Sequence, residues 1–181
     1  SASPRGEAGA AAPSDTRAFN RIVPIVLAVA LFMENMDSTV ISTSLPAIAA
    51  DIGTTAIALK LALTAYLVSL AIFIPISGWM ADRFGARNIF RIAIGVFVVG
   101  SLACAASGSL GAIVGWRILQ GLSGGILVTV PQAILRESFP PQEQGVAMGV
   151  FGMGVVLAPA IGPAIGRALV TAFGWRWIFA L

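Results

Sequence analysis

The sequence predicts an all-α membrane protein whose helices cross a bilayer side by side. Hydrophobic residues make up 57% of the 181 residues and charged residues only 10%, whereas soluble domains carry about 25% charged residues. The apolar residues form long runs between short polar turns, and about 20 apolar residues span the hydrocarbon core as a helix. The runs predict five full membrane helices, at about 22–45, 56–79, 89–106, 110–135 and 146–172, with a sixth starting at 175.

The composition argues against several classes of function. The chain has no histidine and one cysteine, so histidine-based acid–base chemistry, an internal disulfide and a zinc site are not expected. The net charge is +3, but the basic residues lie at the ends of the apolar runs, unlike the clustered basic face of a nucleic-acid-binding protein. No nucleophile elbow or nucleotide-binding loop is present. We therefore predict a protein that is not an enzyme, with no metal and no cofactor.

The distribution of charge predicts the domain organisation and the orientation. Residues 1–20 are rich in Ala, Ser and Pro without apolar periodicity, which is typical of a disordered tail, and residues 21–181 form an incomplete transmembrane bundle. An excess of Lys and Arg in short loops marks the cytoplasmic side. The N-terminus is thus predicted to be cytoplasmic, in a multi-pass protein of the cytoplasmic (inner) membrane. The basic residues expected on that side are Arg5, Arg17, Arg21, Arg83, Arg87, Arg91 and Arg136.

The first helix carries two carboxylates near its middle. Glu34 and Asp37 are three residues apart and so share one helix face. A carboxylate at membrane depth costs about 2.5–3.5 kcal/mol on insertion scales, so such groups face a cavity or a partner. One interpretation is a site for a proton or a substrate, and the other is a structural pair satisfied by neighbouring helices. Pro46 is expected to end this helix.

The segment from Asp37 to Pro46 resembles the helix 1 motif of the fourteen-helix drug:proton antiporters, a branch of the major facilitator superfamily. The residues that match are Asp37, Thr39, Leu45 and Pro46, whereas Ser42 replaces an asparagine. The resemblance implies the N-terminal helical bundle of a major facilitator fold, in a chain that is the N-terminal part of a longer transporter.

A charged turn joins the second and third helices. It carries Gly78, Asp82, Arg83, Gly85 and Arg87. Its shortness forces the two helices to be antiparallel neighbours. The turn resembles the helix 2–3 loop signature of the same superfamily, with Ala86 where a basic residue is usual. The resemblance implies a conformational latch that pairs charges within the loop and with the other half of the transporter. The third helix, which follows, carries small residues suited to close packing.

The fourth helix places an arginine inside the membrane. Arg117, Gln120, Gly121 and Gly124 fall on one face by helical spacing. An intramembrane arginine needs an anion or backbone carbonyls as its partner, unless its side chain extends to the interface from a frayed helix end. The run resembles the arginine-x-x-glutamine-glycine motif of the superfamily, to which proton-transfer roles are attributed.

The fifth helix carries a stripe of small residues broken by prolines. It resembles the antiporter signature of the branch, in which Gly149, Gly162, Pro163 and Gly166 match, and Ala158 and Arg167 replace glycines. The resemblance implies a proton-coupled exporter, with these residues and Gly121 serving helix packing. Such spacing also occurs in ordinary packed membrane helices. The Trp175 segment then resembles the entry to helix 6 of the same branch.

The predicted function is that of a proton-coupled secondary transporter that exports drugs or small metabolites by alternating access. The alternatives are a proton-coupled importer of a small solute on the same fold and, more remotely, a membrane enzyme or receptor. The expected proton and substrate site comprises Glu34, Asp37, Arg117 and Gln120. The expected partners are a lipophilic or cationic small molecule, protons, the lipid bilayer and a C-terminal half of the same protein. The proton gradient would supply the energy.

Overall fold

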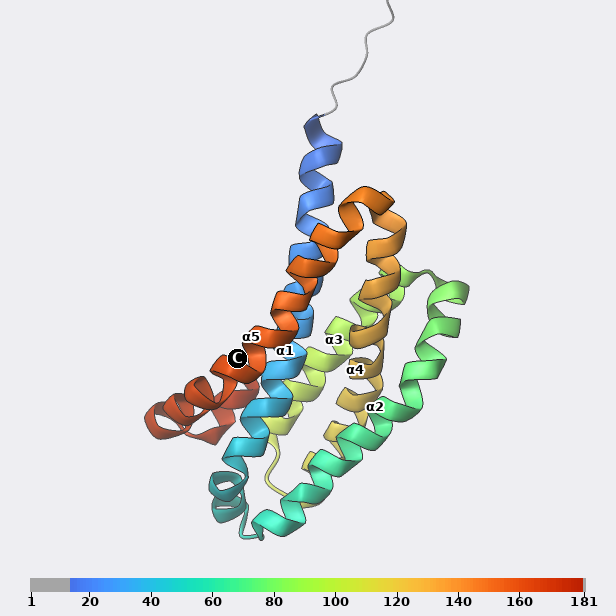
Figure 1. Cartoon of the computed structure of the whole chain (residues 1–181). Coiled ribbons are helices and arrows are strands. Elements are labelled where there is room, and N and C mark those ends of the chain that lie inside the picture. The colour runs from blue at the N-terminus through green and yellow to red at the C-terminus, as the bar shows by residue number, and fades with distance from the viewer. Residues whose placement is uncertain (1–13, 181) are drawn as a thin grey trace, which may run out of the picture.

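The computed structural model describes residues 14–180, with side chains described from 22 to 179, and it is an all-α bundle (Figure 1). Within these residues, five helices are long and apolar enough to cross a membrane. They are α1 (Ser14–Ile52), α2 (Ala56–Phe84), α3 (Ala86–Ala106), α4 (Leu110–Ser138) and α5 (Pro141–Phe173), followed by a short 3-10 helix, η1 (Trp175–Ala180). The predicted fold class is confirmed.

Short capped turns make successive helices antiparallel. Gly85 alone joins α2 to α3, with φ at 86°, a left-handed conformation that glycine adopts without a steric penalty. Its N–H donates to the carbonyl of Ala81 at 2.9 Å, which closes the last turn of α2. At the start of α4, the Ser109 hydroxyl accepts from the N–H of Ala112. The tight turn predicted between the second and third helices is therefore present.

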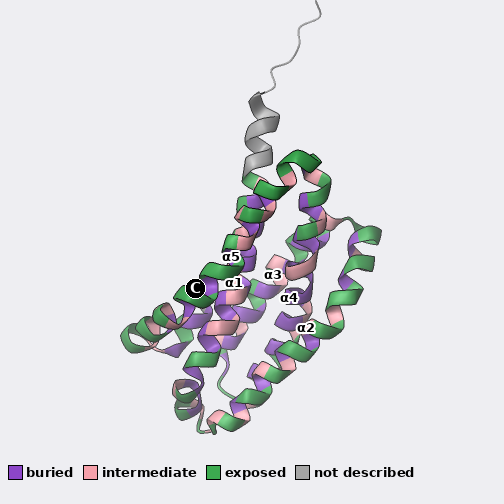
Figure 2. Ribbon diagram, viewed as in Figure 1, coloured by how far each residue is buried: buried purple, intermediate pink, exposed green. Residues whose placement is uncertain are grey.

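Two helix pairs and one covering helix form the bundle. α1 packs along α5, α2 packs along α4, and α3 lies against the other side of α4. Figure 2 shows that α4 is the most enclosed helix, whereas α2 and α5 carry long exposed faces. α4 is therefore the helix at the centre of the bundle, and it carries the predicted site residues Arg117 and Gln120.

Glycines allow the close approach within both pairs. A Cβ on Gly121 of α4 would lie 2.4 Å from the carbonyl oxygen of Tyr66 on α2. On α5, a Cβ on Gly154 would lie 2.5 Å from the carbonyl oxygen of Ala28 on α1. Backbone atoms cannot yield to an extra methyl group, so these contacts require glycine. Sequence analysis singled out Gly121 but missed Gly154.

Two apolar clusters enclose a polar layer. One cluster includes Leu31 and Phe97, and the other includes Val40 and Ile178. Buried polar and charged side chains lie along α1 and α4 at the level where the clusters meet: Glu34, Asp37, Arg117, Gln120 and Ser123. The core thus places its charges away from both ends of the bundle.

The first helix is longer than predicted at both ends. Residues 14–20 are helical, although they were expected in the disordered tail, and residues 1–13 lie outside the described residues. Pro46 does not end α1, which continues to Ile52. Proline is tolerated in a membrane helix, Pro46 is exposed, and the continuation buries Ile48 and Ala49.

The other helix boundaries differ by a few residues. α2 continues to Phe84 instead of ending near 79, and α3 begins at Ala86 instead of 89. α4 ends at Ser138 instead of 135, and α5 begins at Pro141, where a proline in the first turn lacks only an N–H that would be unpaired anyway.

The predicted sixth segment starts where expected, at Trp175, as η1. Two hydrogen bonds fix it to the bundle. The indole N–H of Trp175 donates to Asp51 Oδ2 on α1 at 2.9 Å, and the Ser101 hydroxyl on α3 donates to the Phe179 carbonyl at 2.7 Å. η1 is therefore positioned beside the polar layer.

Candidate functional site

An ion pair between α1 and α4 forms the centre of the polar layer. The guanidinium of Arg117 donates twice to the Asp37 carboxylate, from Nη1 to Oδ2 at 2.5 Å and from Nη2 to Oδ1 at 3.2 Å. The two side chains are only 1% and 7% exposed. Arg117 thus has the anionic partner that an intramembrane arginine needs, and its side chain does not reach an interface.

The guanidinium is also held between two aromatic rings. Its Cζ lies 5.7 Å from the ring centroid of Tyr66 and 5.1 Å from that of Phe179, which is cation–π distance. Among the described residues, the Arg117 Nε–H has no hydrogen-bond partner. Within the described residues, Nε is thus the one guanidinium nitrogen of Arg117 that lacks a partner.

Glu34 has a different partner from Asp37. The Tyr66 hydroxyl donates to Glu34 Oε1 at 2.5 Å, and the two residues are 1% and 5% exposed. The two carboxylates of α1 are therefore divided: one meets a cation and the other meets a neutral hydroxyl. Sequence analysis missed Tyr66. The signal available was that it is the only tyrosine in the chain and lies inside an apolar run.

Gln120 lies in the same layer but joins α4 to α3. Its Nε2 donates to the Phe97 carbonyl at 3.3 Å, and the Cys104 thiol donates to its Oε1 at 3.7 Å. Gly100 lies so close that a Cβ there would be 2.6 Å from the Gln120 side chain. None of the hydrogen bonds among the described residues joins Gln120 to the carboxylates, so it positions α3 against α4.

The residues of the 78–87 turn lie at the end of the bundle, apart from the polar layer. Asp82, Arg83, Gly85 and Arg87 are exposed. Among described residues no ion pair joins Asp82 to the neighbouring arginines. Gly78 has open space where a side chain would lie. The turn is thus free to meet groups outside the bundle.

The small residues predicted on the fifth helix differ in whether they contact α1. Gly162 and Gly166 contact α1, where a Cβ would lie 3.1 Å and 2.8 Å from the Thr39 and Val40 side chains, respectively. Pro163 lies between them and its carbonyl accepts from Arg167 Nε at 3.3 Å. Gly149, by contrast, has no atom within 4 Å of the place where a Cβ would lie. Of the predicted glycines, Gly162 and Gly166 therefore pack on α1, whereas Gly149 does not.

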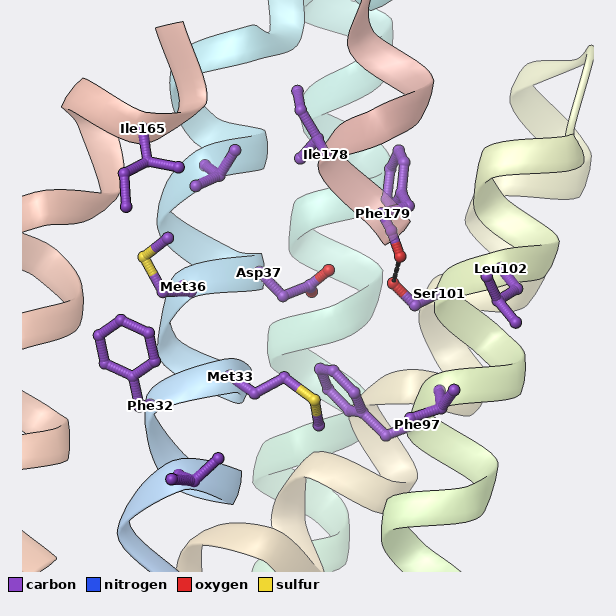
Figure 3. Close-up of a pocket in the computed structure, with 13 residues that line it drawn as sticks. Phe32, Met33, Met36, Asp37, Phe97, Ser101, Leu102, Ile165, Ile178 and Phe179 are labelled. Carbon is purple, nitrogen blue, oxygen red and sulfur yellow. Dashed lines mark hydrogen bonds between the residues drawn. The ribbon is translucent and has the colours of Figure 1, made fainter. Parts of the chain in front are cut away.

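A cavity of about 420 Å³ opens beside the ion pair, between α1, α3, α5 and η1. Figure 3 shows the Asp37 carboxylate pointing into the bundle at this place, with Phe97 and Phe179 near it. Apart from Ser101, the rest of the wall is apolar and rich in methionine and phenylalanine, including Met33, Met36 and Phe32. Asp37 is the one ionisable residue in the described wall.

Comparison with known proteins gives one consistent family. The sequence model described as Major Facilitator Superfamily matches residues 27–181. The "Probable transport protein HsrA" of Haemophilus influenzae is 35% identical over 156 residues, and the "Putative multidrug resistance protein MdtD" of Cronobacter sakazakii is 36% identical over 156 residues. Each match covers 86% of this chain, but only 34% and 33% of the two relatives. The chain therefore spans about a third of the length of these relatives.

Solved structures share the fold at low sequence identity. A D-xylose-proton symporter superposes with a TM-score of 0.76 at 17% identity, covering 90% of this chain and 44% of the symporter. A bacterial homolog of the human lysosomal transporter Spinster, in an inward-facing and unoccupied conformation, gives 0.72 at 19% identity, covering 93% and 37%. At these identities the likeness concerns the arrangement of the helices alone.

Proposed function

Since this chain belongs to the major facilitator superfamily, we propose that it forms part of a proton-coupled secondary transporter that exports drugs or small metabolites. Because the chain spans about a third of the length of these relatives, the proposal concerns a full-length transporter in which this chain is one part. The name of one relative, a multidrug resistance protein, supports export of drug-like molecules.

The charge balance of the polar layer carries this proposal. Glu34 and Asp37 contribute two carboxylates and Arg117 one guanidinium. Arg117 neutralises Asp37, whereas Glu34 receives only a neutral hydroxyl. A carboxylate that no cation neutralises is costly at membrane depth. The layer is therefore stabilised by one further positive charge, which either a proton or a cationic substrate can provide.

This balance leads directly to exchange. A cation that takes the place of a proton at Glu34 leaves the charge of the layer unchanged, so the two compete for one position. The apolar cavity beside Asp37, with its methionine and phenylalanine walls, favours the lipophilic part of such a cation. The proposed substrate class is thus lipophilic and cationic, in line with the exchange of one proton for one positive charge.

The proposed function can be tested with a full-length transporter that contains this chain, in proteoliposomes loaded with a pH-sensitive dye. We expect a monovalent lipophilic cation such as ethidium to drive protons in the opposite direction, and a protonophore to abolish the response. Glu34→Gln should lower cation-driven flux about ten- to a hundredfold, since a hydrogen bond to a charged group contributes about 1.5–3 kcal/mol.

Glu143→Gln is the matched control, because Glu143 lies exposed in the first turn of α5. It should leave the flux unchanged. Equal effects of the two substitutions would contradict the proposed exchange site.

A proton-coupled importer is the second candidate, favoured by the helix arrangement shared with the D-xylose-proton symporter. The same vesicles distinguish the two. An importer moves substrate and protons in the same direction, so substrate entry would acidify the vesicles, whereas entry through an exchanger would make them more alkaline.

The orientation follows from where the basic residues lie. The N-terminal end of α1, the α2–α3 turn and the α4–α5 connection all lie toward one end of the bundle (Figure 1). Arg83, Arg87 and Arg136 are located in these last two connections or beside them. We place this end in the cytoplasm of the inner membrane by the positive-inside rule.

The 78–87 turn is proposed to act as a latch against the other half of the transporter. Its support is the exposed position of Asp82 and the rigid Gly85 turn that fixes its direction. We expect Asp82→Asn to leave expression unchanged, because the residue is at the surface, but to shift the labelling of cysteines introduced on either side of the membrane. Asp82→Glu keeps the charge and should label as the unmodified protein does. Identical labelling of all three proteins would exclude the latch.

A further inference from the structure

We propose that Tyr66 is a positioning residue that keeps Glu34 away from Arg117, and thereby determines which carboxylate stays available for exchange. This inference rests on the proposed function for its consequences in transport. Its geometric basis is independent of any substrate.

Tyr66 contacts both charged neighbours at once. Its hydroxyl donates to Glu34 Oε1 at 2.5 Å, while its ring lies 5.7 Å from the Arg117 Cζ. The side chain is 1% exposed, so it is shielded from solvent. It therefore lies next to both the Glu34 carboxylate and the Arg117 guanidinium.

Arg117 and Glu34 have complementary groups that this arrangement leaves apart. The Arg117 Nε–H has no partner among the described residues, although Nη1 and Nη2 both donate to Asp37. Glu34 is one helical turn from Asp37 and on the same side of α1, and only one of its oxygens accepts a hydrogen bond among the described residues. A buried donor without a partner is unfavourable. Glu34 is thus a second carboxylate that can neutralise Arg117 once Asp37 is replaced and the Tyr66 hydroxyl releases it.

The close contact of α2 with α4 fixes where the Tyr66 hydroxyl lies. A Cβ on Gly124 would lie 3.0 Å from that hydroxyl, and a Cβ on Gly121 would lie 2.4 Å from the Tyr66 carbonyl oxygen. Both glycines leave the space that Tyr66 fills. A displacement of α2 along α4 would therefore move the hydroxyl relative to Glu34 and change the partner of the carboxylate.

The test uses a suppressor experiment in the full-length transporter, read by thermal unfolding in detergent without any ligand. Asp37→Asn removes the present partner of Arg117 and should lower Tm. Tyr66→Phe keeps the ring and removes only the hydroxyl, so Glu34 becomes free to pair with Arg117. We expect the double variant Tyr66→Phe/Asp37→Asn to have a higher Tm than Asp37→Asn alone.

If the Tyr66 hydroxyl were purely structural, its loss would lower the Tm of the double variant below that of Asp37→Asn. Ser69→Ala is the matched control, since Ser69 is also a buried hydroxyl on α2 facing α4, and its hydroxyl donates only to the Ala65 carbonyl. Ser69→Ala/Asp37→Asn should show no recovery. Adding Glu34→Gln to the rescued double variant should abolish the recovery. Where Asp37→Asn yields little folded protein, the monodisperse fraction in size-exclusion chromatography replaces Tm.

A Tm of Tyr66→Phe/Asp37→Asn equal to or below that of Asp37→Asn overturns the inference. In proteoliposomes, Tyr66→Phe should also lower ethidium-driven proton flux several-fold relative to Ser69→Ala. A wild-type protein that moves no ethidium counts against the proposed function alone, because the thermal experiment needs no substrate.

Discussion

Arg117→Gln is expected to remove transport and most of the folded protein. Breaking a buried ion pair by deleting one partner costs about 3–5 kcal/mol. Here the loss leaves two carboxylates, Glu34 and Asp37, without a cation in the same layer. Asp37→Asn should be less damaging, because the layer then holds one carboxylate, Glu34, and one guanidinium, Arg117, and so carries no net charge.

The informative result is how the variants rank in the amount of folded protein and in transport. The double variant Asp37→Asn/Arg117→Gln removes both charges of the pair and should recover much of the folded protein, but no transport. Arg167→Gln is the control, because Arg167 is exposed and donates only to a carbonyl of its own helix. Thermal unfolding and dye flux measure both properties. Folding of Arg117→Gln at the wild-type level would contradict the role given to the ion pair.

Gly121→Ala and Gly149→Ala are expected to change stability in opposite directions. The new methyl group of Gly121→Ala would lie 2.4 Å from the Tyr66 carbonyl oxygen and 2.8 Å from the Ser69 Cβ. Neither atom can move without α2, and such overpacking costs about 1–3 kcal/mol. Gly149 has open space at this position, and alanine is favoured over glycine inside a helix by about 0.5–1 kcal/mol.

Thermal unfolding of the two variants in the full-length protein measures this difference. Gly121→Ala should also lower transport, since a shifted α2 carries Tyr66 away from Glu34. A cysteine pair across α2 and α4 should then cross-link more slowly. Equal Tm values for the two variants would show that the contact between α2 and α4 yields more easily than its distances suggest.

Local features of the sequence were enough to predict the membrane helices and the location of the polar layer. The apolar runs have the length of a bilayer, and Glu34, Asp37 and Arg117 interrupt them. The prediction that Pro46 ends the first helix was wrong, because it considered only the backbone hydrogen bond that proline removes. The helix continues to Ile52, and this continuation buries Ile48 against neighbouring helices.

The partners within the site could not be predicted from the sequence. From the sequence, either Glu34 or Asp37 could be the anionic partner of Arg117, because both lie on one face of α1. Only the packing of α1 against α4 shows that the partner is Asp37. Tyr66 carries no motif, so its role depends on a contact with α1 over a separation of 32 residues. Likewise, glycine spacing on the fifth helix could not distinguish Gly149, which faces open space, from Gly154, which touches the α1 backbone.

Asp37 enters the membrane long before its partner is synthesised. The two residues are 80 positions apart, and at about 5–20 residues per second the ribosome needs roughly 4–16 s to cover that distance. During this interval α1 holds two carboxylates that would each cost about 2.5–3.5 kcal/mol in lipid. We therefore expect α1 to gain stability in lipid when α4 arrives and Arg117 pairs with Asp37.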